Sequence, residues 1–219
     1  MPKTVRVVFT RHANRKDVNK TGITQAGARK SKAQGTKRAL AGQIVKRYSS
    51  SSKRNLSTAK KAQKGYEELV GKRYKLRVRK DITTPVPNKK EWERTVREDF
   101  HGDKKAATIA WLRGKITSDI VLKPNVFVKD LIRKRVGLGK RVVRIGARDL
   151  VLESFTHQEL MLGIFEMLTG ERIEKLRKPL DIKYLESFEI VLFKNGNARL
   201  KIRDKTYDIT QRLNRILRN

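Results

Sequence analysis

The chain has 219 residues, and its 54 Lys and Arg against 22 Asp and Glu give a formal net charge of +32 at pH 7. This length can bury a hydrophobic core as one domain, and the absence of cysteine excludes disulfides and thiolate metal sites. No apolar run approaches the ~20 residues of a membrane helix, and Val5 to Phe9 is too short and too charged for a signal peptide, so we expect a cytoplasmic protein.

The first half of the chain alternates predicted strands with predicted helices. We place strands at 4–10, 43–48 and 74–79, and helices at 24–41 and 54–71. The second helix carries apolar side chains at helical spacing, and Thr24 is of the residue type that caps the start of the first. This alternation predicts βαβ units and a mostly parallel sheet.

Two prolines between Thr83 and Pro87 interrupt the alternation. We expect a helical cap insertion over the sheet at about 83–125. A helix at 125–137 should follow, ending at Gly137-Leu138-Gly139.

The last third of the chain returns to strands. A strand at 149–155 leads to Thr156 and His157, an apolar helix at 160–168 ends at Gly170, and a hairpin joins 188–193 to 198–202 through Asn195-Gly196. The elements together predict a single α/β domain over residues 1–219. Its architecture would be three-layer α/β/α, with a mostly parallel mixed sheet, the helical cap insertion and a C-terminal β-hairpin.

Four pieces of the sequence stand out by their order and spacing. They are the strand ending in Arg11-His12, then Ile23-Thr24-x-x-Gly27, then Tyr48-Ser49-Ser50-x-x-x-Arg54-x-x-x-Thr58-Ala59, and the late strand ending at His157 before a Leu-rich helix. In this order they resemble the histidine phosphatase superfamily, which has the phosphoglycerate-mutase-like fold. The landmarks extend from residue 4 to about residue 171.

The resemblance implies a role for each matching residue. His12 would be the nucleophile that becomes transiently phosphorylated, and Arg11, Arg54 and His157 would bind the transferring phosphoryl group, with His157 also catalytic. Such a reaction needs no metal and no cofactor.

The chemistry of these side chains suits that role. A phosphate monoester carries about −1.5 to −2 charge near neutral pH, and two guanidiniums match both its charge and its geometry. The arginines should also disfavour protonated His12, which leaves a ring nitrogen free to attack. The other ring nitrogen needs a hydrogen bond that fixes the tautomer, and the sequence does not identify that partner.

The chain departs from the family pattern in three places. Ala13 stands where the family usually has Gly, and Gln158 where it usually has Gly or Asp. The third departure is the general acid, for which the candidates are Asp81, Glu91, Glu93 and Glu159, and none matches cleanly. General acid help is worth 10²–10⁴-fold, so its absence would favour activated phosphates over sugar phosphates.

These residues favour a phosphatase acting on a phosphorylated metabolite, nucleotide or phosphoprotein; a mutase is less favoured, because no phosphoglycerate contacts are evident. The charge leaves a second reading open. Residues 1–66 hold eighteen Lys and Arg and one acid, and such a field attracts polyanions. A weakly active or inactive phosphatase-like fold that binds nucleic acid or another polyanion is the alternative. A third hypothesis, an accessory protein of the ribosome, would rest on the charge alone. The charge is also consistent with a lysine-rich surface that has no binding role.

Overall fold

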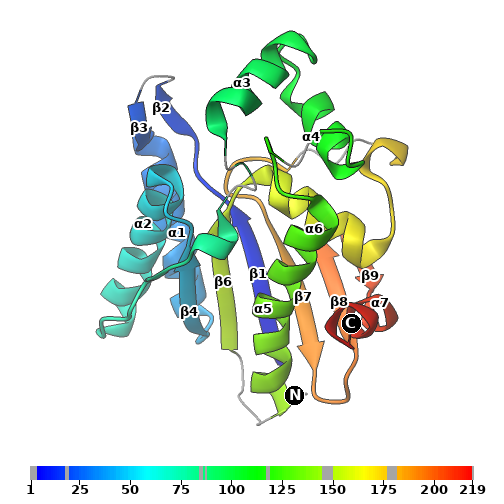
Figure 1. Ribbon diagram of the computed structural model, residues 1–219. Helices are drawn as coiled ribbons and strands as arrows, with labels where there is room; N and C mark the ends of the chain where they lie inside the picture. The colour runs from blue at the N-terminus through cyan, green and yellow to red at the C-terminus, as the bar shows by residue number, and fades with distance from the viewer. Residues whose placement is uncertain are drawn as a thin grey trace.

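The structure, a computed structural model, describes residues 4–17, 20–83, 86, 88–116, 119–144, 150–176 and 182–218. Within them, seven strands form one mixed sheet in the order β5-β4-β6-β1-β7-β8-β9 (Figure 1). The strands are β1 (Thr4–Arg11), β4 (Ile44–Ser49), β5 (Arg77–Val78), β6 (Leu150–Thr156), β7 (Ser187–Phe193), β8 (Ala198–Ile202) and β9 (Lys205–Asp208). The first four strands of that order are parallel, and β7 to β9 add an antiparallel edge.

Helices cover both faces of the sheet, as the three-layer prediction requires (Figure 1). One face packs on α1 (Gln25–Leu40) and α2 (Lys53–Val70), and the other on α5 (Pro124–Arg144), α6 (Gln158–Thr169) and α7 (Thr210–Arg218). Helices α3 (Lys89–Glu98) and α4 (Lys104–Leu112) lie beyond the end of the sheet where β1 finishes (Figure 1). The remaining elements are short: β2 (Arg15–Asp17) pairs with β3 (Lys20–Ile23), and 3₁₀ turns span Lys80–Ile82 and Ile173–Lys175.

Strand β1 shows why the sheet needs both layers. Val7 and Phe9 belong to the large core beneath α5 and α6, whereas Val8 packs with Tyr66 of α2. The side chains of Val7, Val8 and Phe9 are all fully buried. Because successive side chains of a strand point to opposite faces, an uninterrupted apolar strand is stable only when both faces are covered.

Two glycines set the distance between α1 and α2. A Cβ at Gly35 of α1 would overlap the carbonyl oxygen of Ala62, and a Cβ at Gly65 of α2 would overlap that of Lys32. The two helices therefore meet backbone to backbone. This close packing holds the start of α2, which carries Arg54, beside the sheet.

Most predicted elements are confirmed. The strands at 4–10, 43–48 and 149–155 agree with β1, β4 and β6 to within a residue, although Asp149 lies outside the described residues. Thr24 caps α1 by accepting a hydrogen bond from the Gly27 N–H at 2.9 Å. The predicted hairpin is β7 and β8.

Other predictions were wrong or incomplete. The helix expected to end at Gly137 to Gly139 continues to Arg144, because Gly139 is needed where α5 lies against β1 and β7. Only Arg77 and Val78 of the strand expected at 74–79 pair with β4. The β2–β3 pair, β9 and α7 were not predicted. In the insertion expected at about 83–125, residues 84, 85, 87, 117 and 118 lie outside the described residues.

Candidate active site

The candidate site lies where β1 and β6 end side by side. Arg11 is in register with Thr156, so His12 and His157 each follow directly after the end of a strand. The backbone N–H of His12 donates to the carbonyl of Thr156 at 3.2 Å. The two imidazole rings are 5.3 Å apart between centroids and meet edge to face at 70°. Carboxyl ends of parallel strands are the usual ligand position in such sheets, and the sequence prediction placed both histidines there.

The ring of His12 is held in one tautomer. Its side chain is buried, with 4% of its surface exposed, and Nδ1 lies 2.8 Å from the carbonyl oxygen of Ala13. Because a carbonyl can only accept, Nδ1 carries the proton and donates it. Nε2 therefore keeps its lone pair. This contact supplies the partner that the sequence did not identify.

The loop that carries His12 is tied to α2. The N–H of Ala13 donates to Thr58 Oγ1 at 3.0 Å, and Thr58 donates in turn to the carbonyl of Arg54 at 2.7 Å. The Thr58 of the resemblance motif thus links the imidazole of His12 to the helix turn that carries Arg54.

Both imidazoles are neutral near pH 7. Burial is the main cause that lowers the pKa of His12 to about 4, and His157, Arg54 and Arg11 lower it further, against the hydrogen bond to Ala13. Burial, followed by the charges of Arg54 and Arg11, lowers the pKa of His157 to about 4 as well. Among the described residues, the charged neighbours that lower the pKa of both histidines are the cations Arg11 and Arg54. A neutral imidazole with a free ring nitrogen is the nucleophilic form.

The arginines approach this pair from two elements. Arg11 ends β1, and its guanidinium donates to the carbonyl of Ile182 and lies 4.2 Å above the ring of Tyr184. Arg11 Nε is buried without a hydrogen-bond partner. Arg54 is half-buried in the first turn of α2. The structure therefore brings together all four residues predicted to form the phosphate site.

Two helices also begin here. Ser52 caps α2, its Oγ accepting from the Asn55 N–H at 3.3 Å, and His157 occupies the capping position of α6. The N-terminus of a helix carries partial positive charge and free N–H groups. Together with the guanidiniums they make this edge of the sheet favourable for an oxyanion.

The four candidate general acids do not join the histidines. Both oxygens of Asp81 contact Arg135 Nη2, at 2.5 and 2.6 Å. On α3, Glu91 pairs with Arg94 and Glu93 with Lys89. Glu159 lies in the first turn of α6, two residues after His157. In the described part of the chain, no hydrogen bond or ion pair connects any of these carboxylates to His12 or His157.

Two contact residues were missed by the sequence reasoning. Tyr184, in the turn before β7, packs its ring 5.6 Å from that of His12 as well as beneath Arg11. Asn55, fully buried on α2, lies 2.8 Å from His157 Nε2. Tyr184 precedes a strand and has no motif around it, so no sequence signal marks it. Asn55 could have been noted as a polar residue directly after Arg54.

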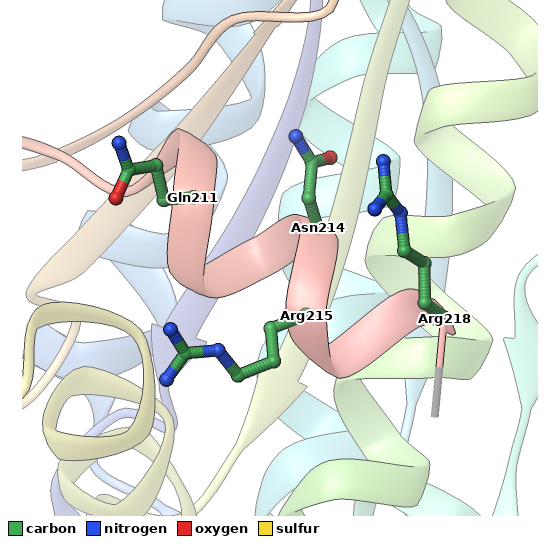
Figure 2. A pocket seen from close by; sticks show the side chains of 4 residues that line it. All are labelled: Gln211, Asn214, Arg215 and Arg218. Carbon is green, nitrogen blue, oxygen red and sulfur yellow. The ribbon is translucent and has the colours of Figure 1, made fainter.

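One surface hollow lies away from the two histidines. It has a volume of about 440 Å³ and is lined by Gln211, Asn214, Arg215 and Arg218 of α7 (Figure 2). Among the described residues, no group of three or more His, Asp or Glu side chains is placed to hold a metal ion. No described helix is both long and apolar enough to span a bilayer.

Comparisons with known proteins give structural matches only. No family model and no curated protein matches the sequence. A mycobacterial glucosyl-3-phosphoglycerate phosphatase superposes with a TM-score of 0.60 at 15% identity, over 91% of this chain and 98% of its own. The protein histidine phosphatase SixA complexed with tungstate superposes with a TM-score of 0.50 at 12% identity, over 94% of this chain and 98% of its own. A phosphoserine phosphatase from Entamoeba histolytica superposes with a TM-score of 0.52 at 13% identity, over 95% of this chain and 99% of its own. At these identities the matches establish the fold, and they confirm the architecture expected from the sequence.

Proposed function

We propose that this chain is a phosphatase that works through a phosphohistidine on His12. The observation that carries the proposal is the hydrogen bond from His12 Nδ1 to the Ala13 carbonyl. It leaves Nε2 unprotonated in a ring whose pKa, among the described charged residues, is lowered by Arg54 and Arg11. The structural neighbours support it, since they include phosphatases.

The reaction would take two displacements. In the first, the Nε2 lone pair of His12 attacks phosphorus, the N–P bond forms and the bond to the leaving oxygen breaks. In the second, water attacks phosphorus, the N–P bond breaks, inorganic phosphate leaves and His12 returns to its neutral state. Arg11, Arg54 and the N–H donors at the helix starts would hold the equatorial oxygens, which is most of what phosphoryl transfer requires.

The position of the carboxylates bears on the substrate class. Asp81 is already bound by Arg135, and Glu91 and Glu93 lie in ion pairs on α3. None of these three carboxylates contacts His12 or His157 in the described part of the chain, and without a carboxylic acid beside the leaving oxygen a simple alkoxide would leave slowly. We therefore propose activated phosphates as substrates. Their leaving groups would depart as stable anions, as from a phosphoanhydride, or as a neutral nitrogen base, as from a phosphohistidine. Glu159 remains the candidate acid for a less activated substrate.

The direct test is hydrolysis of an aryl phosphate. The purified protein should hydrolyse p-nitrophenyl phosphate and be inhibited by vanadate or tungstate, and His12→Ala should reduce turnover to the rate in buffer. Acid-labile, base-stable phosphate should be trapped on the wild type and not on His12→Ala. Turnover that survives in His12→Ala would reject the proposal.

A second candidate function, binding of a polyanion such as nucleic acid, is favoured by one observation. Burial and the charges of Arg144 and Arg218 lower the pKa of Lys140, which donates a hydrogen bond to Asn214. In the described part of the chain, none of Lys140, Arg144, Arg215 and Arg218 forms an ion pair with a carboxylate. This α5–α7 basic surface adjoins the hollow of Figure 2.

Binding measurements separate the two functions. A single-stranded oligonucleotide should bind with an affinity that falls steeply with salt, survives His12→Ala and drops in Arg215→Gln/Arg218→Gln. The matched control is Lys89→Gln/Arg97→Gln, which removes the same charge from α3, where both residues pair with acids. Equal losses in both double variants would mean that net charge, rather than this surface, governs binding.

A further inference from the structure

Asn55 is a buried amide at the centre of a short hydrogen-bond chain. Its side chain is fully buried on the first turns of α2. Nδ2 lies 2.7 Å from Ser50 Oγ and 2.8 Å from His157 Nε2. The same amide therefore contacts the serine turn after β4 and the imidazole after β6.

Which atoms donate and which accept in this series of hydrogen bonds follows from the bonds of Ser52 at its far end. Ser52 Oγ caps α2 by accepting from the Asn55 N–H, and Ser50 donates its hydroxyl hydrogen to Ser52 Oγ at 3.3 Å. Having given its only hydrogen to Ser52, Ser50 must accept from Asn55, so the NH₂ group faces both Ser50 and His157. Asn55 Oδ1 is consequently left buried without a partner, an arrangement that costs stability.

A ring nitrogen that accepts a hydrogen bond carries a lone pair. His157 Nε2 is therefore unprotonated, and in a neutral ring the hydrogen resides on Nδ1. Burial of this ring opposes its protonation, and so do the charges of Arg54 of α2 and Arg11 of β1, the charged neighbours given by the described part of the chain. The neutral ring that results has one N–H donor left for an anion.

We propose that Asn55 is a positioning residue that fixes His157 in the Nδ1–H tautomer, so that a neutral N–H donor is directed at the transferring phosphoryl group. The inference rests on the proposed phosphatase function and deepens it. In this arrangement the anion receives a hydrogen bond from His157 without a third full positive charge beside His12. A neutral nucleophile and a neutral donor can then coexist 5.3 Å apart.

Substituting Asn55 should change the tautomer in a defined direction. In Asn55→Asp, a carboxylate can only accept, so it would draw the hydrogen to Nε2 and raise the pKa of His157. Asn55→Ala removes the donor and should give a mixture of tautomers. The matched control is Gln63→Ala, which deletes another buried amide from α2, one that contacts Arg47 and Glu67 instead of a histidine.

The primary test is the ¹⁵N NMR spectrum of histidine-labelled protein, which is simple because the chain has only three histidines. The wild type should show His157 with protonated Nδ1 and unprotonated Nε2, and Asn55→Asp should reverse this. An Nε2–H tautomer in the wild type would overturn the proposal outright. Since this measurement needs no variant, it decides the matter even if an Asn55 variant fails to fold.

A kinetic test accompanies it. With p-nitrophenyl phosphate, Asn55→Ala should lower kcat by about tenfold to a hundredfold, the range found when a residue that orients a metal-bound histidine is lost. Gln63→Ala should leave kcat of the folded fraction unchanged. Wild-type kcat in Asn55→Ala would overturn the positioning role. If the wild type and His12→Ala turn over equally, the phosphatase function fails instead, and the tautomer stays measurable in the free protein.

Discussion

The hydroxyl of Thr58 accepts a hydrogen bond from the N–H of Ala13 at 3.0 Å and thereby joins the loop of His12 to helix α2. Ala13 also supplies the carbonyl that holds the ring of His12. The position of the His12 ring thus depends on a side chain 46 residues further along the sequence.

Replacing Thr58 with valine should weaken both stability and catalysis. The isosteric side chain leaves the buried Ala13 N–H without an acceptor, which costs about 1–3 kcal/mol, and it frees the loop that orients His12. Urea unfolding and aryl phosphate hydrolysis would measure the two effects. Thr108→Val is the control, because Thr108 is equally a buried helix threonine bonded to the carbonyl four residues before it. Matching kinetic losses in both variants would contradict this role.

Stability should fall in mildly acidic solution. Both His12 and His157 have folded-state pKa values of about 4, below the usual 6.5, so the unfolded chain takes up protons first as the pH decreases. The free energy of unfolding should therefore decline as the pH falls from about 6.5 to 4. The contribution of the two neutral histidines to stability is fully present above pH 6.5. Urea unfolding at several pH values measures the slope. The double variant His12→Asn/His157→Asn should flatten it, and an unchanged slope would refute the assignment.

Tyr184 should matter for phosphate binding. Its ring lies beneath Arg11 and beside His12, and a cation–π contact at a partly exposed site contributes about 0.5–1 kcal/mol. Tyr184→Leu should therefore raise KM for an aryl phosphate by roughly twofold to fivefold. Tyr184→Phe separates the ring from the hydroxyl. If Tyr184→Phe raises KM as much as Tyr184→Leu does, the hydroxyl and not the ring is responsible.

The buried ion pair between Arg47 and Glu153 should contribute more to stability than an exposed ion pair does. The two side chains, on β4 and β6, are fully buried with Nε and Oε2 2.8 Å apart. Glu153→Ala leaves Arg47 buried without its counterion and should cost about 3–5 kcal/mol. Glu68→Ala breaks the exposed pair with Lys32 and should cost at most about 1 kcal/mol. Similar thermal unfolding of the two variants would argue against this difference.

Two glycines of α5 should respond in opposite ways to alanine. A Cβ at Gly139 would lie 2.7 Å from Leu192 Cδ1 and 2.8 Å from Val7 Cγ2, whereas at Gly137 the nearest atom, on Leu217, is 3.6 Å away. Gly139→Ala should therefore destabilise by about 1–3 kcal/mol through overpacking. Gly137→Ala should stabilise by up to about 1 kcal/mol through helix propensity. Denaturant midpoints measure both, and a stabilised Gly139→Ala would contradict the packing described for α5.

Features that depend on local pattern could be predicted from the amino-acid sequence alone. Arg11 ends an apolar strand, His12 and His157 directly follow apolar strands, and Arg54 lies in the first turn of a helix that follows a strand. Because parallel strands bring their carboxyl ends to one edge, this pattern indicated that His12, Arg11 and Arg54 lie near one another, and the resemblance added His157 to them. The resemblance added roles to them, and those roles remain to be tested.

The contact partners of these groups became evident only in the folded molecule. Asn55 meets His157 from a segment 102 residues away, Tyr184 lies beside His12, and Asp81 is taken up by Arg135 rather than by the site. Gly139 reads as a helix end in sequence but serves close packing against β1 and β7. Such contacts join residues distant in the chain, so their free energies are set by packing geometry, which no local spacing encodes.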